Sequence, residues 1–284
     1  MALPYARRRL HELRAKPSDE DEPLGPPGIA PGRKVYEERD DWVTKAVKFV
    51  FGSKALQDPE PLGFKRSGKE AFPEYYGVNL AEWADLLPED QGNKDLTLIR
   101  PLLKQTRLEQ RPMQLIYDAS RHGWSCRSFH QRVDRKGPCV VLARTRGGSI
   151  CGGYNAAGWV GVGELRGAAS AFLFTWPDGD TSKRPLKLPK VGGAGVAICD
   201  FPDKGVSFGM DGFVVPLSSR EPNGPQISYS KLGPYYSRRK DGFPSLFSGV
   251  EKRQAELVEL KVYAGIYKPG EAIPDSKVKL LQLN

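Results

Sequence analysis

The glycine and proline content of this chain most strongly limits the folds that it can adopt. The 284 residues include 31 glycines and 24 prolines, and both types interrupt helix interiors and central strands. Beyond residue 113 they alternate with short runs rich in β-branched and aromatic residues, a pattern typical of strands joined by turns. This composition favours a turn-rich β architecture over a helical bundle.

Short β-prone runs and one capped helix are predicted after residue 113. Ser125 can cap a helix that presents Phe129 and Val133 on one face and ends near Gly137. The glycine pair at 147–148 indicates a hairpin. After a short apolar run at 115–117, the runs predicted as strands are 139–143, 150–154, 172–176, 195–199, 213–217 and 257–267. We therefore expect an α+β protein, a β-sandwich with flanking helices.

The first 111 residues have a different pattern. Residues 3–16 place leucines three and four apart with arginines opposite, which predicts a basic amphipathic helix. Helices are also expected over 36–56, 80–87 and 96–103, the last capped by Asp95. The expected organisation is a basic helix and Pro/Gly-rich linker over 1–33, a helical extension over 34–111, a sandwich domain over 112–269 and a C-terminal tail over 270–284.

The positive charge lies in the second part of the chain. The net charge is +9; residues 1–111 hold 19 basic and 19 acidic residues, whereas 112–284 hold 24 and 15. Such a surplus suits nucleic acid, an acidic membrane surface or an acidic protein partner. It is also common in proteins that stay soluble through their net charge.

Several classes are excluded by composition. No apolar run reaches the roughly 18 residues that a membrane-spanning helix needs. Arg7, Arg8 and Arg9 break the first apolar stretch, so no secretory signal is indicated. Four cysteines without paired spacing do not predict a disulfide framework. We expect a cytoplasmic protein, with the interior of an organelle such as a plastid or mitochondrion as the alternative.

Candidate chemistry concentrates around one short helix. His122, Cys126 and His130 recur every four residues, a spacing with which one helix face can bind a metal. Gly123 and the cap at Ser125 leave His122 outside the helix, so no metal site is predicted. Cys126 beside either histidine has the ingredients for thiol catalysis, but no nucleophile turn surrounds it. No catalytic residue and no cofactor are predicted, and a thiol enzyme or peroxide scavenger using Cys126 is the alternative.

Two further alternatives concern nucleic acid and membranes. The basic, aromatic run 235–240 could contact phosphates and stack a base, although no nucleic-acid-binding signature accompanies it. The glycine clusters at 161–167 and 192–195 match neither a dinucleotide fingerprint nor a phosphate-binding loop. Residues 1–16 could lie on an anionic membrane surface as a peripheral anchor, or form a frayed tail.

Several segments, taken in order, resemble a TLDc domain. The stretch Leu115–Ser125, in which an apolar-Tyr start leads to His122, Gly123 and a short helix, is similar to the opening of that domain. The further matching segments are 138–142, 149–154 with Trp159, 172–176, 206–217 and 260–264. The resemblance covers about 112–267, and the order of the matches, which is that of the family, identifies the chain as a member.

The resemblance implies a β-sandwich flanked by helices, in a family linked to oxidative-stress resistance. No established reaction or cofactor attaches to the family, and several members bind the vacuolar-type proton ATPase and alter its assembly. The chain departs from the family pattern at Ala169-Ser170, where Gly-Glu is usual, and at Lys261, where glutamate is usual. These changes remove acidic groups and help explain the positive surplus.

We therefore expect a non-enzymatic protein-interaction module, TLDc-like over 112–269, that docks on a larger assembly. Proton-ATPase regulation and oxidative-stress protection are the family precedents. The first 111 residues match nothing in the family, so the choice of partner is expected to reside there. The predicted contact residues are Arg121, His122, Trp124, Arg127, Tyr235, Tyr236, Arg238, Arg239 and Lys240.

Overall fold

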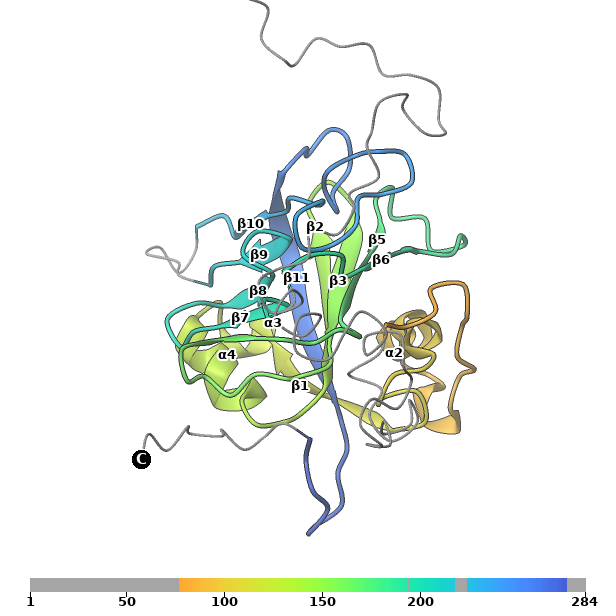
Figure 1. The fold of residues 1–284 in the computed structure, drawn as a ribbon, viewed down its shortest axis with the longest axis vertical. Coiled ribbons are helices and arrows are strands. Elements are labelled where there is room, and N and C mark those ends of the chain that lie inside the picture. Colours follow the sequence, from red (N-terminus) through yellow and green to blue (C-terminus); the bar gives the residue numbers. More distant parts are fainter. Residues whose placement is uncertain (1–76, 194, 218–223, 275–284) are drawn as a thin grey trace, which may run out of the picture. The chain divides into compact units, whose positions relative to one another are not determined.

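The computed structural model describes residues 77–193, 195–217 and 224–274 (Figure 1). The predictions for residues 3–16, 23–33 and 36–56 lie outside these residues, as does the tail after residue 274. The helical segments are η4 (Pro88–Asp90), α2 (Lys94–Ile99), η5 (Arg100–Leu103), α3 (Ala119–His122) and α4 (Cys126–Val133). The strands are β1 (Met113–Asp118), β2 (Cys139–Thr145), β3 (Ile150–Asn155), β4 (Glu164–Arg166), β5 (Phe172–Trp176), β6 (Leu186–Pro189), β7 (Ile198–Asp200), β8 (Val206–Phe208), β9 (Phe213–Val215), β10 (Ile227–Tyr229) and β11 (Gln254–Gly265).

All described strand pairs are antiparallel, and β11 connects two sheets. The strand order is β4-β7-β8-β9-β10-β11-β2-β3-β5-β6, with β1 also paired to β11. The start of β11, 254–256, pairs with β10, whereas 257–264 pair with β2 and 261–265 with β1. We call β1, β2, β3, β5, β6 and most of β11 the first sheet, and β4 with β7 to β10 the second sheet. In Figure 1 β11 is the long blue strand between them.

The two sheets pack closely face to face. A Cβ atom added to Gly153 of β3 would lie 2.7 Å from the ring of Phe208 in β8, so only glycine permits this approach. The ring of Phe208 also lies near Trp159 and Phe213, with centroids 6.0 and 6.5 Å away. These side chains are buried and form the core between the sheets. The predicted α+β fold with a β-sandwich is confirmed.

The other face of the first sheet is covered by the segment before β1. Lys187 of β6 lies between the rings of Trp83 and Phe172, 5.4 and 5.0 Å from their centroids. All five residues of β5 are buried, which explains why this strand is a continuous apolar run rather than an alternating one. The prediction of a strand over 172–176 is confirmed.

Two helix predictions before β1 need correction. The segment 80–87 is not helical; apart from a turn at 80–81 it is irregular, and Leu87 is extended. Pro88 disfavours the helical conformation of the residue that precedes it. The helix predicted over 96–103 begins at Lys94 and becomes a 3₁₀ turn from Arg100, where Pro101 cannot donate a backbone hydrogen bond.

Asp95 was predicted as a helix cap and has another role. Asn93 caps α2 instead and accepts from the backbone N–H groups of Asp95 and Leu96 at 3.1 Å. The Asp95 carboxylate accepts from Arg144 at 2.7 Å and from Lys261 and the Tyr263 hydroxyl at 2.8 Å. It therefore ties α2 to strands β2 and β11.

Candidate functional site

The α3–α4 corner holds four of the nine predicted contact residues, together with Cys126. Asp118 caps α3, and Gly123, with φ of 83°, ends it. Ser125 then caps α4 as predicted, because its hydroxyl accepts from the backbone N–H of Ser128 at 3.2 Å. The break at Gly123 separates His122 from α4, as the sequence indicated.

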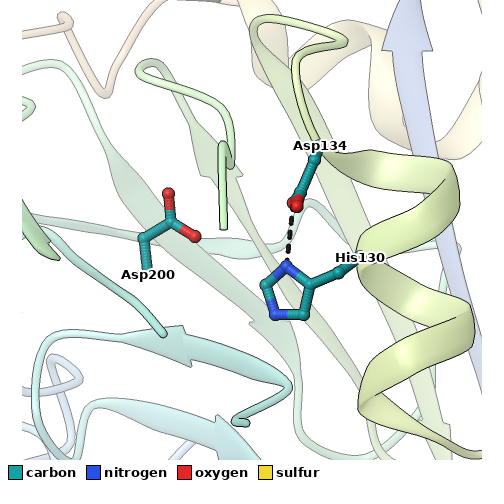
Figure 2. Close-up of side chains that lie close together, drawn as sticks. All are labelled: His130, Asp134 and Asp200. Carbon is teal, nitrogen blue, oxygen red and sulfur yellow. Dashed lines mark hydrogen bonds and ion pairs between the residues drawn. The ribbon is translucent and has the colours of Figure 1, made fainter. Parts of the chain in front are cut away.

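A His–Asp–Asp cluster lies at the C-terminal end of α4. Figure 2 shows His130 beside Asp134, with Asp200 of β7 facing them. The ring nitrogen Nδ1 of His130 lies 2.8 Å from Oδ1 of Asp134, and Nε2 lies 2.8 Å from the carbonyl oxygen of Lys204. One ligand-type atom from each of His130, Asp134 and Asp200 falls within 4.8 Å of the others. His130 and Asp200 are buried, and Asp134 is half-buried.

Asp200 is oriented by the loop between β3 and β4. Its two oxygens accept from the backbone N–H groups of Val160 at 2.7 Å and Gly161 at 3.0 Å. The guanidinium of Arg166 lies 3.7 Å away. Burial raises the pKa of Asp200; the two amides and Arg166 oppose this shift, whereas Asp134 adds to it. The carboxylate is thus held in place but lacks full charge compensation.

The cluster fits a proton better than a metal ion. Both ring nitrogens of His130 face oxygen acceptors, so a doubly protonated ring donates two hydrogen bonds. A metal would need the lone pair of Nδ1, and both oxygens of Asp200 already accept backbone hydrogen bonds. Burial lowers the pKa of His130, but its bonds to Asp134 and Lys204 outweigh burial and raise it.

His122, Cys126 and His130, the three residues with metal-ligand spacing, each have hydrogen-bond partners in the structure. Nδ1 of His122 accepts from the backbone N–H of Asp118 at 3.0 Å. The Cys126 thiol donates to the carbonyl oxygen of Pro216 at 3.1 Å. Each of the three side chains therefore makes hydrogen bonds of its own, His122 with Asp118, and Cys126 and His130 with backbone carbonyls beside the second sheet.

The cysteines lack the features of an activated nucleophile. Burial and the carboxylate of Asp203 raise the pKa of Cys126, which lowers its thiolate fraction at neutral pH. Burial also raises the pKa values of the other three thiols, those of Cys139, Cys151 and Cys199. These shifts count against the thiol-enzyme alternative.

The predicted contact residues at the corner differ in exposure. The side chain of Arg121 is 75% exposed, 3.6 Å from Asp118, and Arg127 is exposed on α4. His122 is half-buried, and Trp124 packs against the core. Arg121 and Arg127 are therefore the residues of this group that a partner can reach most easily.

Two of the predicted residues in loop 235–240 point inward. Tyr236 is fully buried, and its hydroxyl donates to the carbonyl of Ala197 at 2.8 Å. The Arg239 side chain is 10% exposed and donates to the carbonyl of Phe247 at 2.9 Å. Both residues fix the loop, so the accessible part of this predicted surface reduces to Arg238, Lys240 and the half-buried Tyr235.

The cluster at His130 was missed at the sequence level. His130 and Asp134 are four apart, a spacing that places them on one helix face and offers a signal for the pair. Asp200 and Lys204 lie about 70 residues further along, and no local pattern connects them to α4.

The fold and these sites define a β-sandwich protein with flanking helices and a buried, protonatable cluster. Comparison with protein families matches residues 92–252 to the TLDc domain. The match spans more than half of the chain, which belongs to the TLDc family, as the sequence resemblance indicated. It begins at residue 92 and includes α2, so the expectation that none of the first 111 residues match the family is wrong for 92–111; the match ends before β11. TLDc domains are generally not enzymes.

Two further findings concern similarity to curated proteins and membrane-spanning helices. No curated protein sequence matches the chain. Within 77–193, 195–217 and 224–274, no helix is long and apolar enough to cross a membrane.

Proposed function

We propose that this chain is a non-enzymatic protein-interaction module that docks on a larger protein assembly. The observation that carries the proposal is the TLDc match over 92–252. The vacuolar-type proton ATPase is the family precedent for such an assembly, and oxidative-stress protection is the family precedent for the process. The cytoplasm is the proposed compartment.

Exposed basic side chains form the proposed contact surfaces. Arg121 and Arg127 lie at the α3–α4 corner, and Arg238 and Lys240 lie in the loop after Tyr236. Since arginine forms paired hydrogen bonds with carboxylates, an acidic surface is the partner chemistry that these residues fit best. The residues before 112 are proposed to select among acidic partners.

The test is gentle affinity purification of the tagged full-length chain, with the associated proteins identified by mass spectrometry. Stoichiometric recovery of the subunits of one assembly is expected. Arg121→Ala with Arg127→Ala should reduce that recovery at least tenfold, because two charge-assisted contacts are lost. Lys94→Ala with Arg253→Ala removes the same charge from exposed positions elsewhere and serves as the matched control.

Equal recovery with both double variants would contradict a role for the α3–α4 corner. A chain that purifies alone, without any stoichiometric partner, would contradict the proposed function itself. Strong retention on DNA or RNA that falls steeply with salt would favour the nucleic-acid alternative. Binding to anionic vesicles that depends on residues 1–16 would favour the membrane-surface alternative.

A further inference from the structure

We propose that His130 is a protonation-dependent clasp that holds α4, and with it the α3–α4 corner, on the second sheet, so that docking through this corner is regulated by pH. The inference rests on the proposed function, because it concerns the regulation of the same surface. It is carried by the geometry of His130 and by the attachments of α4.

Helix α4 is attached to the second sheet at both ends. At its start, the backbone N–H of Cys126 donates to the carbonyl of Leu217 at 3.1 Å, and the Cys126 sulfur lies 3.1 Å from the carbonyl oxygen of Pro216 and 3.3 Å from that of Asp203. At its end, Nε2 of His130 lies 2.8 Å from the carbonyl of Lys204. The turn between β7 and β8 therefore supports both ends, and the His130 ring makes the attachment at the C-terminal end.

Only the doubly protonated ring satisfies both of its neighbours. Nδ1 faces a carboxylate and Nε2 faces a carbonyl, and both groups are acceptors. A neutral ring carries one N–H, so one nitrogen would present a lone pair to an oxygen atom 2.8 Å away. Loss of the proton thus breaks one of the two hydrogen bonds and replaces it with a repulsive contact.

The charges around the ring favour the proton. Asp134 from the helix end and Asp200 from β7 both face it, and Arg166 from β4 lies 3.7 Å from Asp200. The turn contributes Asp203, near Cys126, and Lys204, whose ammonium lies 5.2 Å from the centre of the Phe201 ring. Arg166 also forms an ion pair with Glu164, with 3.2 Å between its Nε and Oε1 of the glutamate.

With the ring neutral, the two carboxylates of the cluster lose the positive charge of the imidazolium, and Arg166 remains beside Asp200. The pKa of His130 is raised in the folded protein, so the stability from its proton is fully present below about pH 6.5 and is lost as pH rises through the folded pKa.

The clasp is coupled to the exposed arginines through α4. The Ser128 hydroxyl donates to the carbonyl of His122 at 2.6 Å, which joins the end of α3 to α4. Phe129 packs edge-on against Tyr117 of β1, with ring centroids 5.4 Å apart. Release of the C-terminal end of α4 therefore changes how Arg127 is presented beside Arg121.

The test measures proton binding and helix protection in the full-length chain, without a partner. NMR of the His130 imidazole gives its pKa, which is expected above about 6.5. Hydrogen exchange then gives the intrinsic-rate-corrected protection of residues 127–134 at about pH 6 and about pH 9. Wild-type protection should fall about tenfold or more at the higher pH, since a charge-assisted hydrogen bond is lost.

Two variants and one metal titration make the test decisive. His130→Gln should show low protection at both pH values, whereas His122→Gln, the matched control, should keep the wild-type drop. An imidazole that titrates at or below about 6.5, or protection of α4 that does not change with pH, would overturn the clasp. Stoichiometric binding of ZnCl₂ by wild type but not by His130→Gln would also overturn it, because the cluster would then hold a metal.

Failure of the clasp and failure of the proposed function are distinguishable. pH-independent protection together with partner recovery that depends on Arg121 and Arg127 removes only the clasp. A pH-dependent helix in a chain that recovers no partner removes the proposed function and leaves the proton-binding site.

Discussion

Arg100 is the residue on which the segment before β1 depends most. It is fully buried, and its guanidinium makes five polar contacts. Nε and Nη2 donate to the two oxygens of Asp90 at 2.7 and 3.0 Å, and Nη1 donates to the carbonyls of Leu108, Glu109 and Arg111. The side chain therefore links η4 and η5 to the turn that leads into β1.

Arg100→Met keeps much of the aliphatic volume and removes every donor. It leaves Asp90 as an unpaired buried carboxylate, a loss worth about 3–5 kcal/mol. The carbonyls of Leu108 and Arg111 also lose a donor, at about 1 kcal/mol each. We expect the free energy of unfolding to fall by about 5 kcal/mol, a large share of the stability of a typical domain.

Urea denaturation followed by tryptophan fluorescence measures this loss. Asp90→Leu added to Arg100→Met should restore about 2–3 kcal/mol, because it removes the unpaired charge. Arg132→Met, at an exposed position of α4, is the control and should change stability by less than about 0.5 kcal/mol. A loss below about 1 kcal/mol in Arg100→Met would refute the reasoning, since the buried pair would then not hold this segment.

Two further predictions concern acid stability and thiol reactivity. Burial raises the pKa of Asp95, but its hydrogen-bond donors and the nearby cations outweigh burial and lower it. The ionised Asp95 therefore stabilises the fold above about pH 4, and this stabilisation is lost as pH falls through the folded pKa. Asp95→Asn should lower Tm at pH 7 by several degrees, and the gap to wild type should close in acid; a gap that stays constant would contradict this. With a thiol reagent at pH 7, Cys126 should react slowly and the buried thiols only on unfolding; rapid labelling near pH 6 would revive the thiol-enzyme alternative.

The sequence was most informative where local rules determine structure. Ser125 has the side chain of a helix cap, and 172–176 is a continuous apolar run, so both elements were predicted correctly. Residues 80–87 have helical spacing, yet the backbone N–H of Ala84 donates to the carbonyl of Pro101 at 2.9 Å. A tertiary contact and Pro88 override the local pattern there.

Side-chain contacts between segments far apart in the fold could not be predicted from the sequence. Tyr236 and Arg239 have the composition of a binding loop, but their partners Ala197 and Phe247 belong to other segments. Their inward orientation follows from packing that no local pattern encodes. The strands β4, β6, β8 and β10 were also missed, because runs of three or four residues carry too little periodicity to be recognised.

Strand β11 has a consequence for biosynthesis. It is the last described strand in chain order, and it pairs with β1, β2 and β10. While the chain is being translated, the edges of β2 and β10 stay open until residue 265 has left the ribosome. Such late, long-range closure slows folding and exposes strand edges. The nascent chain therefore passes through a stage in which chaperones can bind these edges, and premature termination before β11 leaves both sheets open.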